Sequence, residues 1–394
     1  MGRNKFVEVA ITENNSKWEE CIKRQKKLYQ RAGDIRSEFS RDYNRILHSC
    51  AYRRLKHKTQ VFFATRNDHI CTRIEHVTHV ASVSYTIANY LGLNTELTNA
   101  IAIGHDLGHA PFGHKGENIL KEIALEKINK DFWHERNSLR FIDEIETLPD
   151  ENGKEQNLDL TYAVRDGIMS HCGEVDENAI FPRIENINFE KIQKAGEYSP
   201  FTWEGCVVKI SDKISYIGRD IEDAVNLGIL KYSQLKELKR VVSKITGVTD
   251  IRDINNTVLM HGFIVDLCNS SSPEKGLKFS DTYLPYIDLV KRFNYNNIYY
   301  HKRLDIFKQY AELIINSIFK TLSSYYDGKD TLFRIQNCER SYPFLARTFL
   351  EWIIKYSDID LEKRNNSNFQ NDIIYRIDNE KDYYYRCRRE QQGY

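Results

Sequence analysis

Residues 105–117 (HDLGHAPFGHKGE) carry three histidines, one aspartate and one glutamate within a single short run. Imidazole nitrogens and carboxylate oxygens together form the donor set that binds Mn²⁺, Fe²⁺, Mg²⁺ or Zn²⁺, depending on geometry. The neighbouring His105 and Asp106 would leave a helix about 100° apart, so they can share only an ion that lies between their two directions. Other segments must therefore supply further ligands.

Two helical segments can do so. His76 begins a segment whose apolar residues recur every three or four positions, the pattern of an amphipathic helix. These apolar residues are Val77, Val80, Val83, Ile87 and Leu91. Asp212 lies in a second such segment, whose apolar residues are Val208, Ile210, Ile214, Ile217 and Ile221. A carboxylate in an apolar helix needs a partner or a metal ion. His79 lies one turn after His76, and by its spacing alone it could take the place of His76 as a metal ligand.

The order His76, His105-Asp106, Asp212 resembles the H…HD…D signature of the HD superfamily of metal-dependent phosphohydrolases. The flanking segments are similar to those of the deoxyguanosinetriphosphate triphosphohydrolase-like enzymes. The similar segments are SRDYNRI (40–46), YRRLKHKTQV (52–61), HDLGHAPFGHKGE (105–117), DKISYIGRDIEDA (212–224) and, more weakly, KRFNYNNIYYHKR (291–303). Each segment is specific, and their occurrence in this order is more specific still.

This resemblance implies an all-α fold, an HD-domain helical bundle with additional C-terminal helices. The 19 glycines and 7 prolines among 394 residues agree with it, because they fall below the usual ~12% and favour long helices over many turns. We expect four regions: an N-terminal helical segment with a basic block (1–60), the HD catalytic core (61–225), a C-terminal helical region completing the pocket and oligomer contacts (226–364), and a polar Tyr/Arg-rich tail (365–394). Residues 174–203 lack a helical period and predict a long loop or short hairpin near the site entrance.

Composition sets limits on location and partners. We expect a cytoplasmic protein without membrane association, because no apolar run reaches the ~18 residues needed to span a bilayer and the N-terminus does not resemble a signal peptide. The eight cysteines contain no CxxC pair, which is typical of reduced thiols in a cytosol. The net charge of +1 argues against an affinity of the whole protein for nucleic acid. A local basic block is either a solvated helix face or a wall that binds polyphosphate; it consists of Arg53, Arg54, Lys56 and Lys58.

The resemblance also implies roles for individual residues. It implies that one divalent ion (Mn²⁺, Mg²⁺, Fe²⁺, Co²⁺ or Zn²⁺) is bound by His76, His105, Asp106 and Asp212, with a further Mg²⁺ on the triphosphate left open. The implied catalytic residues are His114, Glu117, His134 and His109. His114 and Glu117 are three residues apart, close enough on a helical turn for the carboxylate to hold the imidazole for acid–base work. For His109 and His134, capping a helix or lining the pocket is the alternative.

The substrate contacts that the resemblance implies are Gln60, Arg73, Lys213, Tyr216, Asp220 and Tyr299. Arg73 and Lys213 would contact phosphates. Tyr216 and Asp220, four residues apart on one helix face, would flank a sugar, with Asp220 accepting from its 3′-hydroxyl and Gln60 as a second sugar contact. Tyr299 would exclude a 2′-hydroxyl by steric clash, although a plain core tyrosine is the alternative.

The function that the resemblance implies is hydrolysis of deoxynucleoside triphosphates, dGTP or several dNTPs, to deoxynucleoside and tripolyphosphate, controlling dNTP pools. It also implies a homo-oligomer, a tetramer or hexamer, and leaves open a nucleotide activator and a single-stranded nucleic acid as partners. Two alternatives remain. One is another HD phosphohydrolase acting on a cyclic nucleotide or an alarmone, and the other is a nucleotide-sensing or single-strand nucleic-acid-binding protein.

Overall fold

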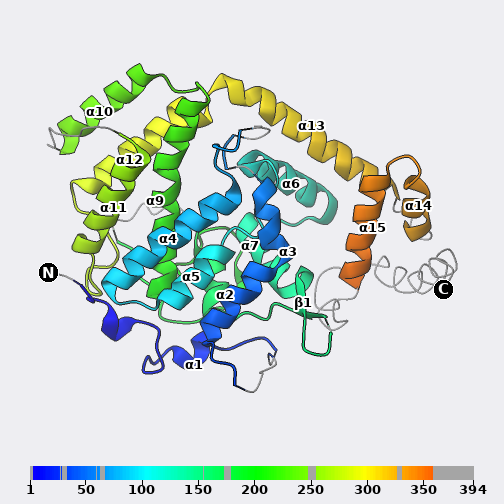
Figure 1. The fold of residues 1–394 in the computed structure, drawn as a ribbon, viewed down its shortest axis with the longest axis horizontal. Coiled ribbons are helices and arrows are strands. Elements are labelled where there is room, and N and C mark those ends of the chain that lie inside the picture. The colour runs from blue at the N-terminus through cyan, green and yellow to red at the C-terminus, as the bar shows by residue number, and fades with distance from the viewer. Residues whose placement is uncertain are drawn as a thin grey trace.

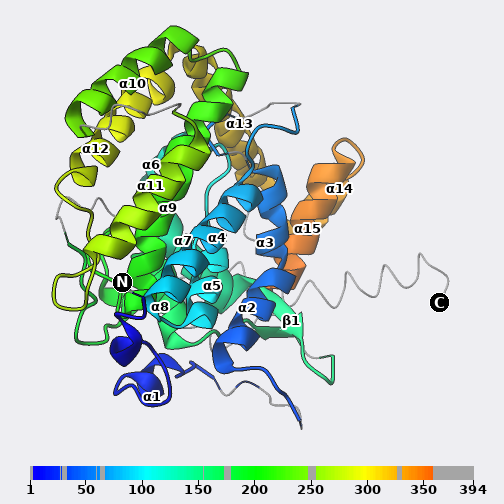
Figure 2. The ribbon, with the colours of Figure 1, turned by 60° about the vertical axis from the view of Figure 1, so that its left-hand side comes forward.

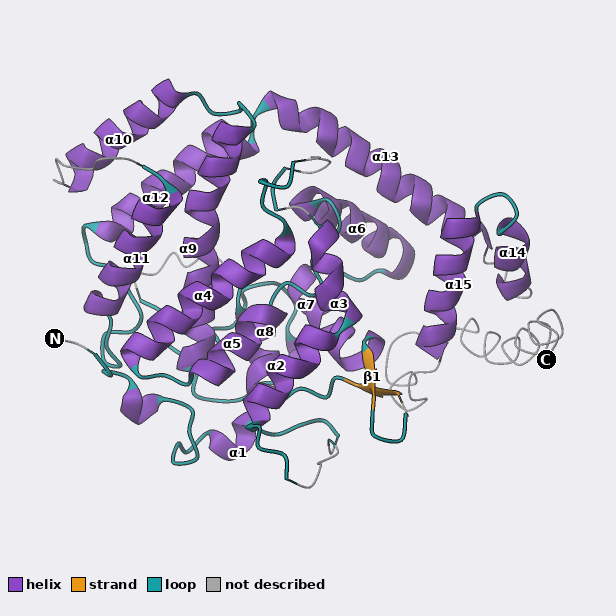
Figure 3. Cartoon of the chain, viewed as in Figure 1, coloured by secondary structure: helices purple, strands orange, loops and turns teal. Residues whose placement is uncertain are grey.

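The computed structural model describes residues 3–26, 28, 33–58, 60–62, 67–153, 155–172, 179–246, 254–325 and 331–357. Within these residues nearly all of the regular secondary structure is helical, as Figure 3 shows. Its one sheet there is an antiparallel hairpin of β1 (Thr147–Pro149) and β2 (Glu155–Asn157). The predicted all-α class is confirmed.

Five packed helices form the centre of the molecule. They are α2 (Glu38–His48), α4 (Arg73–Leu91), α5 (Thr95–Gly104), α8 (Tyr162–Ser170) and α9 (Trp203–Asn226). In both ribbon views α4 lies beside α5 and α9 (Figures 1 and 2), and it packs directly against both. The apolar stripes predicted for residues 77–91 and 208–221 are buried, as expected from their helical period. Hydrophobic burial therefore holds together the segments that carry the candidate ligands.

The helix α4 begins at Arg73 because of a local capping signal. The Thr72 backbone N–H donates to Glu75 Oε2 at 2.7 Å, which completes a capping box. The helix ends at Leu91 and is capped by Gly92, whose φ of 85° is in the left-handed region that glycine adopts without strain. Arg73 and His76 consequently lie in the first turn of α4, close to the loop that precedes it.

The remaining elements surround this centre. On the N-terminal side they are η1 (Val7–Val9), α1 (Trp18–Cys21), α3 (Cys50–Arg54) and η2 (Leu55–His57). The middle of the chain adds α6 (Gly113–Ile128), α7 (His134–Arg140), η3 (Phe141–Ile145) and η4 (Phe189–Lys191). The C-terminal region adds α10 (Tyr232–Thr246), α11 (Asn256–Ser270), α12 (Tyr283–Asn294), η5 (Tyr295–Tyr299), α13 (Lys302–Tyr325), α14 (Thr331–Cys338) and α15 (Pro343–Ser357).

The C-terminal helices continue the central packing. Helices α11 and α12 pack against α9, and α13 crosses over α6 toward α14 and α15 (Figure 1). A first hydrophobic core lies between α4, α9, α11 and α12, and a second lies between α2, α4, α5 and α8. Both cores contain residues of α4 and α9. The packing therefore fixes the position of side chains in the first turn of α4 that face α9.

Residues 179–202 form an irregular segment whose one helical turn is η4, as predicted for that part of residues 174–203; residues 174–178 lie outside the described residues. Ile180 forms an isolated antiparallel bridge with Leu277. The four predicted regions stay predictions, and the tail at 365–394 lies outside the described residues. None of the helices described combines the length and apolarity needed to cross a bilayer.

Candidate active site

The predicted site residues gather around one cavity of about 830 Å³. Those that line it are Gln60, Arg73, Asp106, His109, His114, His134, Asp212, Lys213, Tyr216, Asp220 and Tyr299. The other three, His76, His105 and Glu117, lie directly behind this lining, within 4 Å of Asp212, Asp106 and His134. The fold therefore brings together residues more than 200 positions apart in a cavity of the size that binds small molecules.

The four predicted metal ligands form one cluster: His76 lies in the first turn of α4, His105 and Asp106 directly follow α5, and Asp212 lies in the middle of α9. His76 Nε2 lies 2.9 Å from Asp212 Oδ1. His105 Nε2 lies 3.9 Å from the same oxygen and 3.8 Å from Asp106 Oδ2. The donor atoms of His76, His105 and Asp212 lie within 4.8 Å of one another, and His105 also lies next to Asp106, so His105 links the four candidate ligands in one cluster.

His105 has the hydrogen bonding expected of a metal ligand. Its Nδ1 lies 2.6 Å from the Ala102 carbonyl oxygen, which can only accept, so this nitrogen carries the ring proton. Its Nε2 then carries a lone pair, and this atom is buried without a hydrogen-bond partner. A backbone acceptor on the far nitrogen is the usual arrangement behind a metal-binding histidine. The residues present therefore fit a divalent ion.

The two carboxylates of this cluster are ionised. Burial alone would raise the pKa of Asp106, but Arg73 and the neighbouring histidines hold it well below its usual range. Arg73 Nη1 donates to Asp106 Oδ2 at 2.7 Å. His76 and His105 likewise lower the pKa of Asp212 against the effect of burial. Negative charge on both groups favours a cation between them.

Glu117 lies between two imidazoles. It accepts a hydrogen bond from the backbone N–H of His134 at 2.8 Å, and His134 Nδ1 lies 3.1 Å from the same oxygen. His114 Nδ1 lies 3.6 Å from the other oxygen, and the His114 side chain is 84% exposed. His134 is therefore the nearer partner of Glu117, while His114 extends into the cavity. The proposed dyad of His114 and Glu117 stays a prediction.

His109 is buried in the cavity wall. Burial and the nearby Arg73 lower its pKa well below the usual range, so the ring is neutral. Its Nδ1 lies 3.0 Å from the Ala110 carbonyl oxygen, and its Nε2 is buried without a partner. This nitrogen is available to accept a hydrogen bond from a ligand or water.

A phenol and a carboxylate meet at another part of the cavity wall. The Tyr299 hydroxyl, from η5, donates to Asp220 Oδ2, on α9, at 2.5 Å. Burial raises the pKa of Asp220 to about 7. Its second oxygen, Oδ1, is buried without a partner, and such an orphan acceptor is available to a ligand hydroxyl. Tyr216 and Lys213 line the same cavity from α9.

Comparison with known proteins agrees with this geometry. A model of the HD domain matches residues 73–217. A deoxyguanosinetriphosphate triphosphohydrolase-like protein of Desulfatibacillum aliphaticivorans is 38% identical over 268 residues, which cover 67% of each chain. A protein of the same name from Clostridium perfringens is 35% identical over 75% of this chain and 76% of its own. Another, from Caldanaerobacter subterraneus, is 41% identical, and the match covers 56% of this chain and 57% of that relative.

The chain belongs to the deoxyguanosinetriphosphate triphosphohydrolase-like family. Its HD domain is that of a metal-dependent phosphohydrolase, and the His/Asp cluster can hold the ion. The predicted resemblance is thereby confirmed.

The basic block of this family member does not line the cavity. Arg53, Arg54 and Lys56 are exposed, and Arg54 pairs with Glu146 at 2.6 Å. Lys58 donates to the His109 carbonyl oxygen, and burial lowers its pKa to about 8. Of the two alternatives, the solvated helix face therefore applies to Arg53, Arg54 and Lys56. Lys58 instead supports the loop that carries His109.

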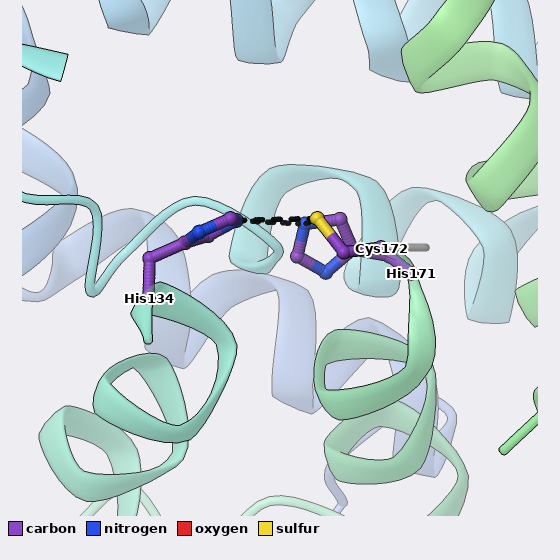
Figure 4. A group of neighbouring side chains, drawn as sticks. All are labelled: His134, His171 and Cys172. Atoms are coloured by element: carbon purple, nitrogen blue, oxygen red, sulfur yellow. Dashed lines mark hydrogen bonds between the residues drawn. The ribbon is translucent and has the colours of Figure 1, made fainter. Parts of the chain in front are cut away.

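Two residues that the sequence did not indicate lie at the same cavity. His171 and Cys172 follow α8, and both line the cavity next to His134 (Figure 4). They belong to no spaced motif, so only the packing of α8 against α5 and α9 brings them there. The one local signal was a histidine directly after a fully buried helix, where a polar side chain needs a partner.

Proposed function

We propose that the chain hydrolyses deoxynucleoside triphosphates to deoxynucleoside and tripolyphosphate. The observation that carries this proposal is that one cavity joins the His/Asp cluster to the Asp220–Tyr299 pair. The first fits the phosphate end of a nucleotide and the second fits a sugar hydroxyl. A general phosphohydrolase has no need for the second.

The reaction breaks the bond between the α-phosphorus and the 5′-oxygen. Water attacks the α-phosphorus, its proton is removed, and the 5′-oxygen leaves with a proton as the deoxynucleoside hydroxyl. A divalent ion held by His76, His105, Asp106 and Asp212 would polarise an α-phosphate oxygen and help orient water.

The chain's own groups supply charge and proton transfer. Arg73 is held by Asp106 with its guanidinium at the cavity, where it offsets negative charge on the phosphates, and Lys213 acts likewise. His114 extends into the cavity and would move the proton of the water or the leaving oxygen, with Glu117 orienting it. His134 shares Glu117 and is the second candidate for this step.

A product assay tests the proposal. Pure protein is incubated with each of the four dNTPs, singly and mixed, with Mn²⁺ or Mg²⁺, and the products are separated by chromatography. Deoxynucleoside and tripolyphosphate in equal amounts support the proposal. Turnover of only a cyclic nucleotide or an alarmone, or nucleotide binding without any turnover, contradicts it. Faster turnover in the mixture would reveal a nucleotide activator, and light scattering tests the tetramer or hexamer.

The first prediction concerns the 2′ position of the sugar. Changing Tyr299 to alanine is expected to raise kcat/KM for GTP relative to dGTP, because the ring that excludes a 2′-hydroxyl is removed. Tyr299→Phe is the matched control, since it keeps the ring and removes only the hydroxyl that donates to Asp220. Equal relaxation by both variants, measured for all four bases, would contradict exclusion by the ring.

The second prediction concerns the 3′-hydroxyl. The unmodified chain is expected to prefer dNTPs to 2′,3′-dideoxynucleotides, because a buried Asp220 Oδ1 without a partner penalises a substrate that lacks the hydroxyl. A hydrogen bond to a charged group is worth ~1.5–3 kcal/mol, so Asp220→Asn should reduce this preference by about 10- to 100-fold. Unchanged discrimination in steady-state kinetics would remove Asp220 from the sugar site.

The same residue predicts a pH dependence. The pKa of Asp220 is raised to about 7, so the carboxyl is neutral below this pH and ionised above it. An ionised carboxylate accepts a stronger hydrogen bond. The ratio of kcat/KM for dGTP over dideoxy-GTP should therefore rise between about pH 6 and pH 8. In Asp220→Asn the ratio should be flat, and a slope that survives in this variant would assign the titration to another group.

A further inference from the structure

Three side chains form a compact group of metal-binding atoms at the cavity wall, beside the four predicted ligands; His171 also lies within 4.8 Å of His105 and Asp106. His134 Nε2 lies 3.4 Å from His171 Nε2 and 3.4 Å from Cys172 Sγ, and Cys172 Sγ lies 3.3 Å from His171 Nε2. Figure 4 shows His134 extending from the start of α7 toward His171 and Cys172 at the end of α8. The three atoms thus form a nearly equilateral triangle.

The hydrogen bonds of the two Nδ1 atoms determine whether the Nε2 atoms in this triangle carry a proton or a lone pair. His134 Nδ1 lies 3.1 Å from Glu117 Oε1, and His171 Nδ1 lies 2.7 Å from the Ile168 carbonyl oxygen. Both partners are acceptors, so both Nδ1 atoms carry the ring proton. The two Nε2 lone pairs then face each other. The single S–H of Cys172 can satisfy only one of them, and either a metal ion bound by both nitrogens or a proton on one of them would satisfy the pair.

The spacing of the three atoms suits a tetrahedral ion. With metal–nitrogen bonds of ~2.0–2.1 Å and a metal–sulfur bond of ~2.3 Å, tetrahedral donor atoms lie about 3.3–3.6 Å apart. The nitrogen–nitrogen separation of 3.4 Å matches the ~3.3–3.4 Å expected of such a pair, whereas the two nitrogen–sulfur separations, 3.4 and 3.3 Å, are slightly shorter than the ~3.5–3.6 Å that the longer metal–sulfur bond gives. Acceptors behind both imidazoles are also the usual arrangement around a bound metal.

The surroundings add negative charge. Glu135 is 1% exposed, and neither of its carboxylate oxygens has a hydrogen-bond partner. Its Oε2 lies 3.4 Å from His134 Nδ1. Asp106 Oδ1 lies 4.0 Å from His134 Nε2. Buried carboxylates need compensating positive charge, which a dication beside His134 would provide.

We propose that His134, His171 and Cys172 bind a second metal ion, a thiophilic transition-metal ion such as Zn²⁺, next to the HD ligands. Sulfur in this site selects a softer ion than the all-nitrogen and oxygen HD cluster does. On binding, Cys172 releases its proton and the sulfur coordinates as the thiolate. The proposal does not depend on which nucleotide the chain hydrolyses.

A proton is the competing occupant of this position. Burial lowers the pKa of His134, but Cys172 and Glu135 raise it well above its usual range. A charged His134 ring would carry a proton on Nε2 and could donate it to the lone pair of His171 Nε2. Metal spectroscopy distinguishes the two occupants.

Cobalt is the probe, because Co²⁺ takes zinc sites and a thiolate ligand gives it a charge-transfer band in the near ultraviolet. The metal-stripped full chain is titrated with Co²⁺, and zinc content is measured separately by mass spectrometry after loading with Zn²⁺. The band is expected in the unmodified chain and should be lost in Cys172→Ser, which should also bind one zinc fewer per chain. Cys50→Ser, which changes an exposed thiol, is the matched control and should keep both.

Two further variants keep the test decisive. His171→Gln should lose the band with every thiol still present, which covers the case in which Cys172→Ser fails to fold, as judged by circular dichroism. His76→Ala removes an HD ligand and should keep the band. Absence of the band in the unmodified chain, or its persistence in folded Cys172→Ser or His171→Gln, would overturn the proposal. Neither readout uses turnover, so a failure of dNTP hydrolysis leaves this test unaffected.

Discussion

Changing Asp106 to asparagine should reduce metal-dependent turnover by ~10³-fold or more, because a metal ion contributes several kcal/mol of transition-state stabilisation. Asp106 lies among the candidate ligands, and its charge is maintained by Arg73 at 2.7 Å. Asparagine keeps the size and can still accept from Arg73, but it lacks the negative charge that attracts the ion. Initial rates with dNTPs across a Mn²⁺ titration measure the effect, and metal content is measured on the same sample.

The control for this change is Asp131→Asn, which alters an exposed carboxylate that pairs with Lys121 and accepts from the Phe132 backbone N–H. A surface pair of this kind contributes ~0–1 kcal/mol, so activity and metal content should match the unmodified chain. Asp106→Asn also replaces one partner of a buried ion pair, and its folding is therefore checked by circular dichroism. A folded Asp106→Asn protein with normal activity and normal metal content would eliminate the proposed metal site.

Changing His114 to alanine should lower kcat by ~10²–10⁴-fold, the range for a general acid–base group, and should leave the metal at the HD cluster in place. The His114 side chain is 84% exposed, lines the cavity and lies 3.6 Å from Glu117. Such a ring can approach a bound substrate, whereas His134 is buried against Glu117 and His171. Single-turnover kinetics with saturating dNTP separates this chemical step from binding and product release.

His57→Ala provides the comparison, because His57 is exposed and does not line the cavity; it should be fully active. Loss of the HD metal in His114→Ala would make His114 a ligand and reverse the division of roles. Full activity in that variant would instead remove His114 from the proton step.

Local patterns in the sequence determined the helices and the order of the candidate ligands. The period of three and four in residues 77–91 and 208–221 predicts which faces are buried, because each helix must bury its apolar stripe. The capping signal at Thr72 and Glu75 is equally local, and it begins α4 where Arg73 and His76 then lie in the first turn. The helical pattern and the family motif together were enough to predict His105, Asp106 and Asp212 as candidate ligands.

Tertiary structure alone decided which side chains meet. Glu117 lies nearer to His134 than to His114, although the sequence spacing favours His114. Tyr299 reaches Asp220 from a π-helical turn 79 positions away.

His171 and Cys172 enter the site only because α8 packs between α5 and α9. The physical reason is the same in each case. Helical period and capping depend on residues a few positions apart, whereas the distance between two side chains on different helices depends on the packing of the whole core.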